Sequence, residues 1–133
     1  MSRPNDPRSE FLTSLRVGAA GARELAAELE ADSVPTRIPT VVIQELYVGV
    51  GEDATEDVRA YEALVANKPV VDRDDNIARW AGILEGHHPT DDAKPTLGPG
   101  DAIVAATGLV CNEPVVTNDG DFESVDGLAV EQY

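Results

Sequence analysis

The sequence predicts an α/β fold, in which a short parallel sheet carries helices on both faces. Short apolar runs alternate along the chain with segments of helical composition or spacing, which is the pattern of a parallel α/β sheet. No internal repeat or low-complexity segment interrupts this alternation. The chain has 133 residues, which is the size of one domain with a hydrophobic core of its own.

The N-terminal half contains three predicted segments. Residues 1–9 are polar and include two prolines, so we expect a loose tail. Residues 11–30 predict helix, with a break near the glycines of 18–21, and the part from 22 to 31 has a good helix composition. Arg37 and Ile38 predict a short strand, and a helix then runs from Pro39-Thr40 to about Val50, since proline is tolerated at a helix start.

The C-terminal half continues the alternation. Residues 75–85 predict a helix whose inward face carries Ile77, Trp80, Ala81 and Leu84. Three prolines and several Asp residues predict a loop over 87–99. The other expected elements are a polar helix over 52–67, an apolar helix over 101–110, and strands over 69–72, 114–117 and 128–130.

The net charge of −15 is the strongest feature of the composition. Asp and Glu total 25, whereas lysine occurs only at positions 68 and 94, which suggests adaptation to molar intracellular salt. A disordered acidic chain is excluded because 42% of the residues are hydrophobic and they fall in periodic segments. The charge neither supports nor excludes an RNA ligand, since the Debye length is only about 3 Å in 1 M salt.

Several classes of protein do not fit the sequence. No apolar run approaches the roughly 18 residues of a transmembrane helix, and the N-terminus has no apolar stretch of the signal-peptide type. The single cysteine, Cys111, rules out an internal disulfide and fits a reducing cytosol. We therefore expect a cytoplasmic protein without a membrane segment.

Three carboxylates occupy positions that a metal site would use. Glu45 shares a helix face with Val41 and Val42, Asp101 stands at a helix start, and Asp119 follows the strand over 114–117. In open α/β sheets, sites lie beyond the carboxyl ends of the strands. Acids that meet there repel one another and need protons or cations, so the pattern predicts a divalent-metal site acting on phosphodiesters.

Each of these acids also has a simpler interpretation. Glu45 could face solvent or pair with an arginine. Asp101, judged alone, is better explained as the N-cap of its helix, with the segment 98–100 as lead-in, although capping and metal binding are compatible. The segment 118–121 has the composition of a tight turn.

His87 and His88 form a pair that could suggest zinc. Adjacent residues rarely chelate one ion, and no cysteine or third histidine stands nearby, so we expect a surface loop there.

Three sequence blocks together resemble a PIN domain of the VapC toxin type. They are Thr-x-x-x-x-Glu-Leu at 40–46, Asp-Ala-Ile-Val-Ala-Ala-Thr at 101–107, and Thr-x-Asp-x-Asp-Phe-x-x-Val-x-Gly-Leu-x-Val at 117–130. The resemblance covers roughly residues 11–133, and the C-terminal block is its most specific part. It implies a PIN-like three-layer α/β/α domain over 11–133, preceded by a loose or altered tail over 1–10.

The chain departs from this family at its first motif. Such proteins open with an apolar strand ending in Asp-Thr-Asn or Asp-Thr-Ser, whose Asp is a metal ligand. Placing Phe11-Leu12 on the next two positions of that motif puts Arg8 where the Asp should be. We therefore expect the first strand to be absent or altered, with Asp6 and Glu10 as poor substitutes. A misassigned start or frameshift, a degraded inactive copy and a divergent site all explain this departure.

The resemblance implies a metal-dependent endoribonuclease, the toxin half of a toxin–antitoxin pair. Mg²⁺ or Mn²⁺ would be held by Glu45, Asp101 and Asp119, with Asp121 and Thr117 as accessory residues. RNA would be the substrate, and the partners would be a small antitoxin and a second copy of the chain. The alternative is a non-catalytic PIN-like binding module that dimerises or sequesters antitoxin.

Overall fold

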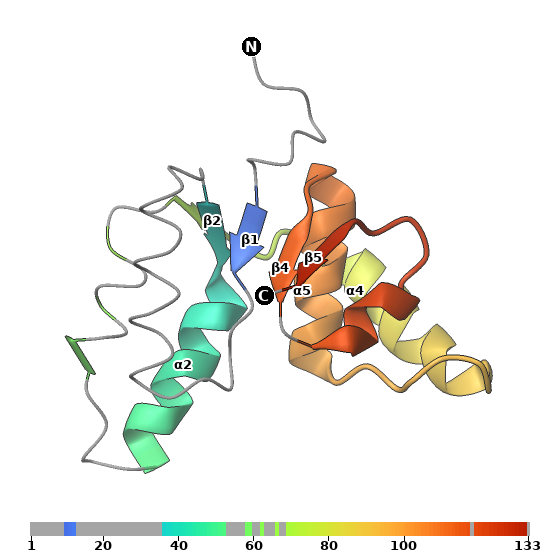
Figure 1. Ribbon diagram of the computed structural model, residues 1–133, viewed down its shortest axis with the longest axis horizontal. Helices are drawn as coiled ribbons and strands as arrows, with labels where there is room; N and C mark the ends of the chain where they lie inside the picture. Colours follow the sequence, from blue (N-terminus) through green and yellow to red (C-terminus); the bar gives the residue numbers. More distant parts are fainter. Residues whose placement is uncertain are drawn as a thin grey trace.

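The structure is a computed structural model that describes residues 10–12, 36–52, 58–59, 62, 66, 69–117 and 119–132. Short strands and helices alternate along these segments, as expected (Figure 1). The strands are β1 (Glu10–Leu12), β2 (Thr36–Pro39), β3 (Val70–Val71), β4 (Val115–Thr117) and β5 (Val130–Gln132). The helices are α2 (Thr40–Glu52), α4 (Asp75–His87) and α5 (Pro99–Cys111), with short 3₁₀ helices η1 (His88–Thr90) and η2 (Gly120–Ser124).

The five strands form one parallel sheet in the order β3-β2-β1-β4-β5. Phe11 of β1 is in register with Arg37 of β2 on one side and with Val115 of β4 on the other. The prediction of helix from residue 11 was therefore wrong, and the first strand, expected to be absent or altered, is present as three residues. Its brevity hid it, because periodicity does not distinguish so short an apolar run from the start of a helix.

Helix α5 contributes more buried residues than any other helix of the described chain. Its buried residues are small, which lets the helix lie close to the sheet and to α4: Ala102, Val104, Ala105, Ala106, Thr107 and Gly108. The Thr107 hydroxyl donates to the Ile103 carbonyl oxygen at 2.7 Å, so this buried polar group is satisfied. Close packing of α5 therefore rests on side-chain size.

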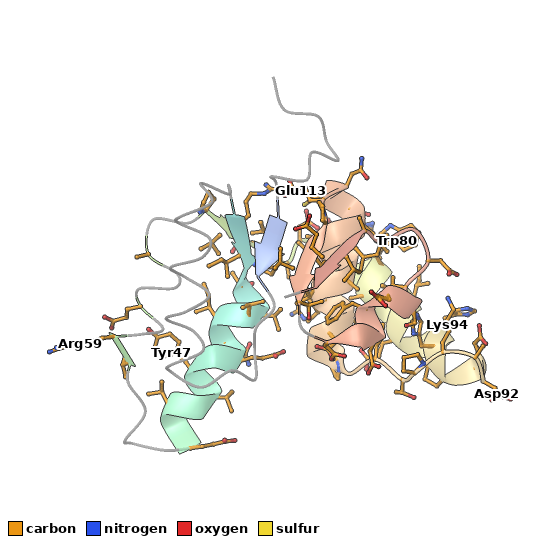
Figure 2. All side chains as sticks on the ribbon, in the orientation of Figure 1. Tyr47, Arg59, Trp80, Asp92, Lys94 and Glu113 are labelled. Atoms are coloured by element: carbon orange, nitrogen blue, oxygen red, sulfur yellow. The ribbon has the colours of Figure 1, made fainter. Side chains whose placement is uncertain are left out.

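Helix α4 begins at an Asp cap and packs on α5 through one stripe. The Asp74 carboxylate accepts a hydrogen bond from the Ile77 backbone N–H at 2.8 Å. Ile77, Ala81 and Leu84 are buried, as predicted, whereas Trp80 is 45% exposed (Figure 2). The inward placement of Trp80 was wrong because it lies beside the stripe that the other three residues define.

The segment 87–99 is more ordered than the loop that its prolines predicted. His88 begins η1 and is only 1% exposed, so its assignment to a surface loop was wrong. Its Nδ1 lies 3.0 Å from the Pro95 carbonyl oxygen. Further along, Lys94 donates to the Asp126 carboxylate at 2.8 Å, and this hydrogen bond lowers the pKa of Asp126. The segment is thus fixed at two points.

The turn between α5 and β4 is closed by polar contacts at the amino edge of the sheet. Asn112 has φ 53° and caps α5 in the left-handed conformation, with its backbone N–H directed at carbonyl oxygens of the last turn. Arg37 of β2 forms an ion pair with Glu113 (Figure 2). Partial burial raises the pKa of the nearby Cys111 thiol, which suppresses its reactive thiolate form.

The remaining predictions lie largely outside the described residues. These are the tail over 1–9, the helix over 22–31 and most of the polar helix over 52–67, of which residues 58, 59 and 62 are helical. No helix in the described segments is both long and apolar enough to cross a lipid bilayer.

Two glycines provide a matched test of the α5 packing. A Cβ on Gly108 would lie 2.7 Å from Leu128 Cδ1 and 3.1 Å from the Glu113 carbonyl oxygen, whereas a Cβ on Gly82 of α4 meets nothing within 4 Å. Gly108→Ala is expected to lower the free energy of unfolding by about 1–3 kcal/mol. Gly82→Ala is expected to raise it by about 0.5–1 kcal/mol, because alanine is the better helix former.

Chemical denaturation of the two variants measures both effects at one salt concentration. Both substitutions replace a helical glycine by alanine, so both gain the same helix propensity. The difference between their free energies of unfolding therefore reports the steric crowding around position 108. Equal stabilisation by both substitutions would contradict the close approach of α5 to β4 and to Leu128.

Candidate functional site

The topology brings the predicted acids to the carboxyl edge of the sheet. Helix α2 begins directly after β2, so its first turns lie at that edge. Helix α5 ends just before β4 begins, so it runs antiparallel to β4 and starts at the same edge (Figure 1). Because β4 ends there at Thr117, the elements that carry Glu45, Asp101 and Asp119 converge.

The Glu45 carboxylate packs against Gly100, the residue that precedes Asp101. A Cβ placed on Gly100 would overlap Glu45 Oε1 and would lie 3.0 Å from Glu45 Cδ. The Glu45 carboxylate therefore occupies the space where any other residue at position 100 would have a side chain, immediately before Asp101 on the chain. Glu45 and Asp101 are both partly buried. The interpretation of Glu45 as a residue that simply faces solvent is wrong.

Asp101 is not the N-cap of α5. Gly98 occupies that position, with Pro99 following as the first helical residue, so the capping interpretation was wrong. Asp101 lies in the first turn, where the positive end of the helix dipole favours an ionised carboxylate. The sequence Gly98-Pro99-Gly100 therefore starts the helix and also makes room for Glu45.

Asp119 is held by hydrogen bonds at the end of β4. Its backbone N–H donates to the buried Thr117 hydroxyl oxygen at 3.0 Å. Its carboxylate accepts from the Asp121 backbone N–H at 2.9 Å and so caps η2, where a tight turn was predicted. Asp121 is exposed, and Phe122, 1% exposed, anchors the segment in the core.

The donor set fits a hard divalent cation in kind but is incomplete in number. Carboxylate oxygens are the ligands that Mg²⁺ and Mn²⁺ take, and Gly100 leaves the space that the Glu45 carboxylate needs. Among the described residues, however, no group of three or more His, Cys, Asp or Glu side chains has the geometry to hold an ion. The structure thus brings the Glu45 carboxylate to Gly100, the residue before Asp101, and the three-acid site remains a prediction.

The central strand contributes no acid at this edge. Since β1 spans Glu10–Leu12, its last residue is Leu12, and Arg8 precedes the strand. The sequence-based placement of Arg8 at the first ligand position was therefore wrong, because a residue at the carboxyl edge must follow the strand. Glu10 begins β1 at the opposite edge, and Asp6 lies outside the described residues.

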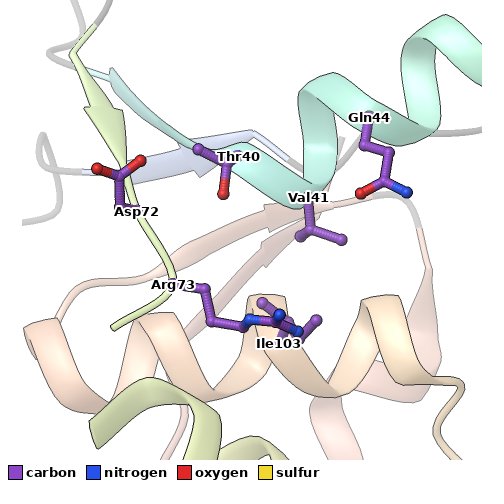
Figure 3. A pocket seen from close by; sticks show the side chains of 6 residues that line it. All are labelled: Thr40, Val41, Gln44, Asp72, Arg73 and Ile103. Carbon is purple, nitrogen blue, oxygen red and sulfur yellow. The ribbon is translucent and has the colours of Figure 1, made fainter. Parts of the chain in front are cut away.

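A cavity of about 390 Å³ lies beside Glu45 between α2, α5 and the segment after β3 (Figure 3). It is lined by Thr40, Val41, Gln44, Asp72, Arg73 and Ile103. Sequence reasoning missed these residues because they come from three elements and share no spacing. One signal was available, since Arg73 is a cation in a strongly acidic run, Asp72-Arg73-Asp74-Asp75.

Comparison with known proteins accounts for this arrangement. A family model described as PIN domain matches residues 11–128. Ribonuclease VapC5 from Mycobacterium tuberculosis is 32% identical over 121 residues, which cover 88% of this chain and 87% of that protein. The family match begins at Phe11 in β1, which agrees with the place of β1 as the first strand of the domain.

Solved structures agree with the sequence match. The VapBC-5 toxin–antitoxin structure from Mycobacterium tuberculosis matches with a TM-score of 0.66 and 29% identity, covering 95% of this chain and 98% of that one. The DNA-bound VapBC structure from Salmonella typhimurium matches with a TM-score of 0.74 and 18% identity, covering 92% and 97%. The second likeness shows the fold alone, and together the matches confirm the expected α/β fold. The chain belongs to the PIN domain family.

Proposed function

We propose that this protein is a ribonuclease of the VapC type, the toxin component of a toxin–antitoxin pair. The observation that carries the proposal is the placement of the Glu45 carboxylate against Gly100, next to Asp101. Glu45 of α2 thus reaches the residue before Asp101 of α5 at the carboxyl edge, and Asp119 follows β4, which ends at the same edge. The 32% identity to Ribonuclease VapC5 supports the same activity.

Mg²⁺ or Mn²⁺ would be held by Glu45, Asp101 and Asp119. When bound, the cation supplies an acidified water molecule and neutralises charge on the scissile phosphate. Asp101 contributes a carboxylate in the first turn of α5, where the positive end of the helix dipole attracts negative charge. The Thr117 hydroxyl fixes the backbone of Asp119, and Asp121 fixes its carboxylate through a backbone N–H, so both act as accessory residues.

The end of β1 favours a second candidate function. Leu12 stands where the resemblance expects an acid, and the first acid after it in the sequence is Glu24. A site that lacks this ligand binds metal more weakly and positions the attacking water less well. The alternative is therefore a PIN-like module that has lost cleavage and binds or sequesters antitoxin.

The proposed partners are RNA, a small antitoxin that occupies the acidic groove, and a second copy of the chain. Solved relatives such as VapBC-5 are toxin–antitoxin complexes, which supports the antitoxin. We place the protein in a cytoplasm of molar salt, where a chain of net charge −15 approaches RNA with its long-range repulsion screened.

The unmodified chain is expected to cleave RNA weakly with Mg²⁺ or Mn²⁺. Leu12→Asp is expected to raise the rate by on the order of a hundredfold, because it supplies a carboxylate at the end of the central strand. The measurement is cleavage of a labelled RNA in concentrated KCl, with circular dichroism to verify folding. Leu12→Asn is the control of equal size without charge. Strong cleavage by the unmodified chain would show that a ligand from β1 is dispensable.

Asp101→Asn is expected to reduce cleavage by about a hundredfold or more, in the unmodified chain or in the Leu12→Asp variant, because it removes one ligand charge. Asp75→Asn is the matched control, since Asp75 and Asp101 both lie in the first turn of a 13-residue helix, and Asp75 pairs with Arg79 on α4. Stabilisation by Mn²⁺ in thermal melts is expected to fall only with Asp101→Asn. Equal losses from both substitutions would argue for a general helix-start effect.

A further inference from the structure

The cavity lined by Arg73 lies along the same α2–α5 contact that places Glu45 against Gly100. Gly100 of α5 contacts Glu45 of α2, and Ile103, one turn later on α5, shares the cavity with Val41, one turn earlier on α2. The two helices therefore run antiparallel here. Along the two helices, the cavity lies about one helical turn, roughly 5.4 Å, from the contact between Glu45 and Gly100. This displacement is comparable to the step from one nucleotide to the next.

Arg73 differs from Arg37, Arg79 and Lys94 in having no carboxylate partner among the described residues. Arg37 pairs with Glu113, Arg79 with Asp75, and Lys94 with Asp126. Within the described segments, neither an ion pair nor a hydrogen bond engages the Arg73 side chain. Figure 3 shows it extending from the segment after β3 toward Ile103 on α5, and Asp72 also lines the cavity. Its guanidinium is thus available to an anion.

The remaining lining suits a nucleotide. The Thr40 hydroxyl and the Gln44 amide supply polar groups on one wall, and Val41 and Ile103 supply an apolar surface. A guanidinium binds a phosphate through two parallel hydrogen bonds, which fixes its orientation as well as its position. In a chain of net charge −15, one such cation beside the acids decides where a polyanion can approach.

We propose that this cavity is a subsite for the phosphodiester next to the scissile one in a single-stranded RNA, with Arg73 as its positioning residue. The assignment rests on the proposed function, because the acids define where the scissile phosphate lies. Asp72 opposes the bound phosphate by like-charge repulsion and limits how tightly RNA is held. Arg73 therefore raises the affinity for RNA, and Asp72 lowers it.

The test uses fluorescence anisotropy with a short fluorescein-labelled single-stranded RNA and no divalent metal, so that binding is read without cleavage. Arg73→Gln is expected to weaken binding about tenfold. It is also expected to reduce the slope of log affinity against log KCl concentration by roughly 0.7, the value for one phosphate contact on a single strand. Asp72→Asn is expected to strengthen binding. The KCl series covers concentrations at which circular dichroism shows a folded chain.

Arg79→Gln is the control for loss of one positive charge, because Arg79 is exposed on α4 and paired with Asp75. It is expected to leave affinity and salt slope unchanged. In cleavage assays on the Leu12→Asp background, Arg73→Gln is expected to raise KM while leaving kcat close to that of the background.

The possible results distinguish a failure of the proposed subsite from a failure of the proposed ribonuclease function. If Arg73→Gln and Arg79→Gln changed RNA affinity equally, or if Asp72→Asn weakened RNA binding, the subsite would be overturned. The proposed ribonuclease function would not be affected by either result. The subsite would also be overturned if Asp101→Asn abolished cleavage while Arg73→Gln left KM unchanged. If the unmodified chain binds no RNA at all, both the subsite and the ribonuclease assignment fall.

Discussion

The parallel pairing of β1 with both β2 and β4 is the constraint on which the rest of the molecule depends. This strand of three residues joins the N-terminal elements, β2 and α2, to the C-terminal elements, α5 and β4. Glu45 belongs to the first group and Asp101 and Asp119 to the second. Because β1 holds the two groups in register, the elements that carry these acids reach the same edge of the sheet, although β1 itself has no acid at its carboxyl end.

Much of the fold could be predicted because proline and glycine mark its boundaries. Thr40 follows a proline at the start of α2, and α5 begins after Gly98-Pro99, so both helices were expected close to where they lie. The strand β1 could not be recognised, since two apolar residues have no period. Trp80 and His88 were misplaced for a related reason: local composition gives hydrophobicity or polarity, whereas burial depends on what packs opposite.

In the candidate site, too, residues within a sequence motif could be predicted, whereas features formed by residues far apart in the sequence could not. Glu45 and Asp101 could be named because each stands in a recognisable motif, and the meeting of Glu45 with the residue before Asp101 agrees with that choice. The role of Gly100 was hidden, because it depends on a side chain more than fifty positions earlier in the sequence. The cavity around Arg73 was equally hidden, since it exists only when three separate elements are assembled.

The fit of Glu45 against Gly100 has a mechanical consequence for the two helices. The Glu45 carboxylate fills the volume that a side chain at position 100 would occupy, so it fits against α5 only where a glycine stands. If α2 slid along α5 by one helical turn, the Glu45 carboxylate would meet Ile103 or Val104, which lie on the same face as Gly100 and carry a Cβ. The same contact therefore sets both the alignment of α2 with α5 and the position of the Glu45 charge. The two helices cannot slide past each other without displacing Glu45.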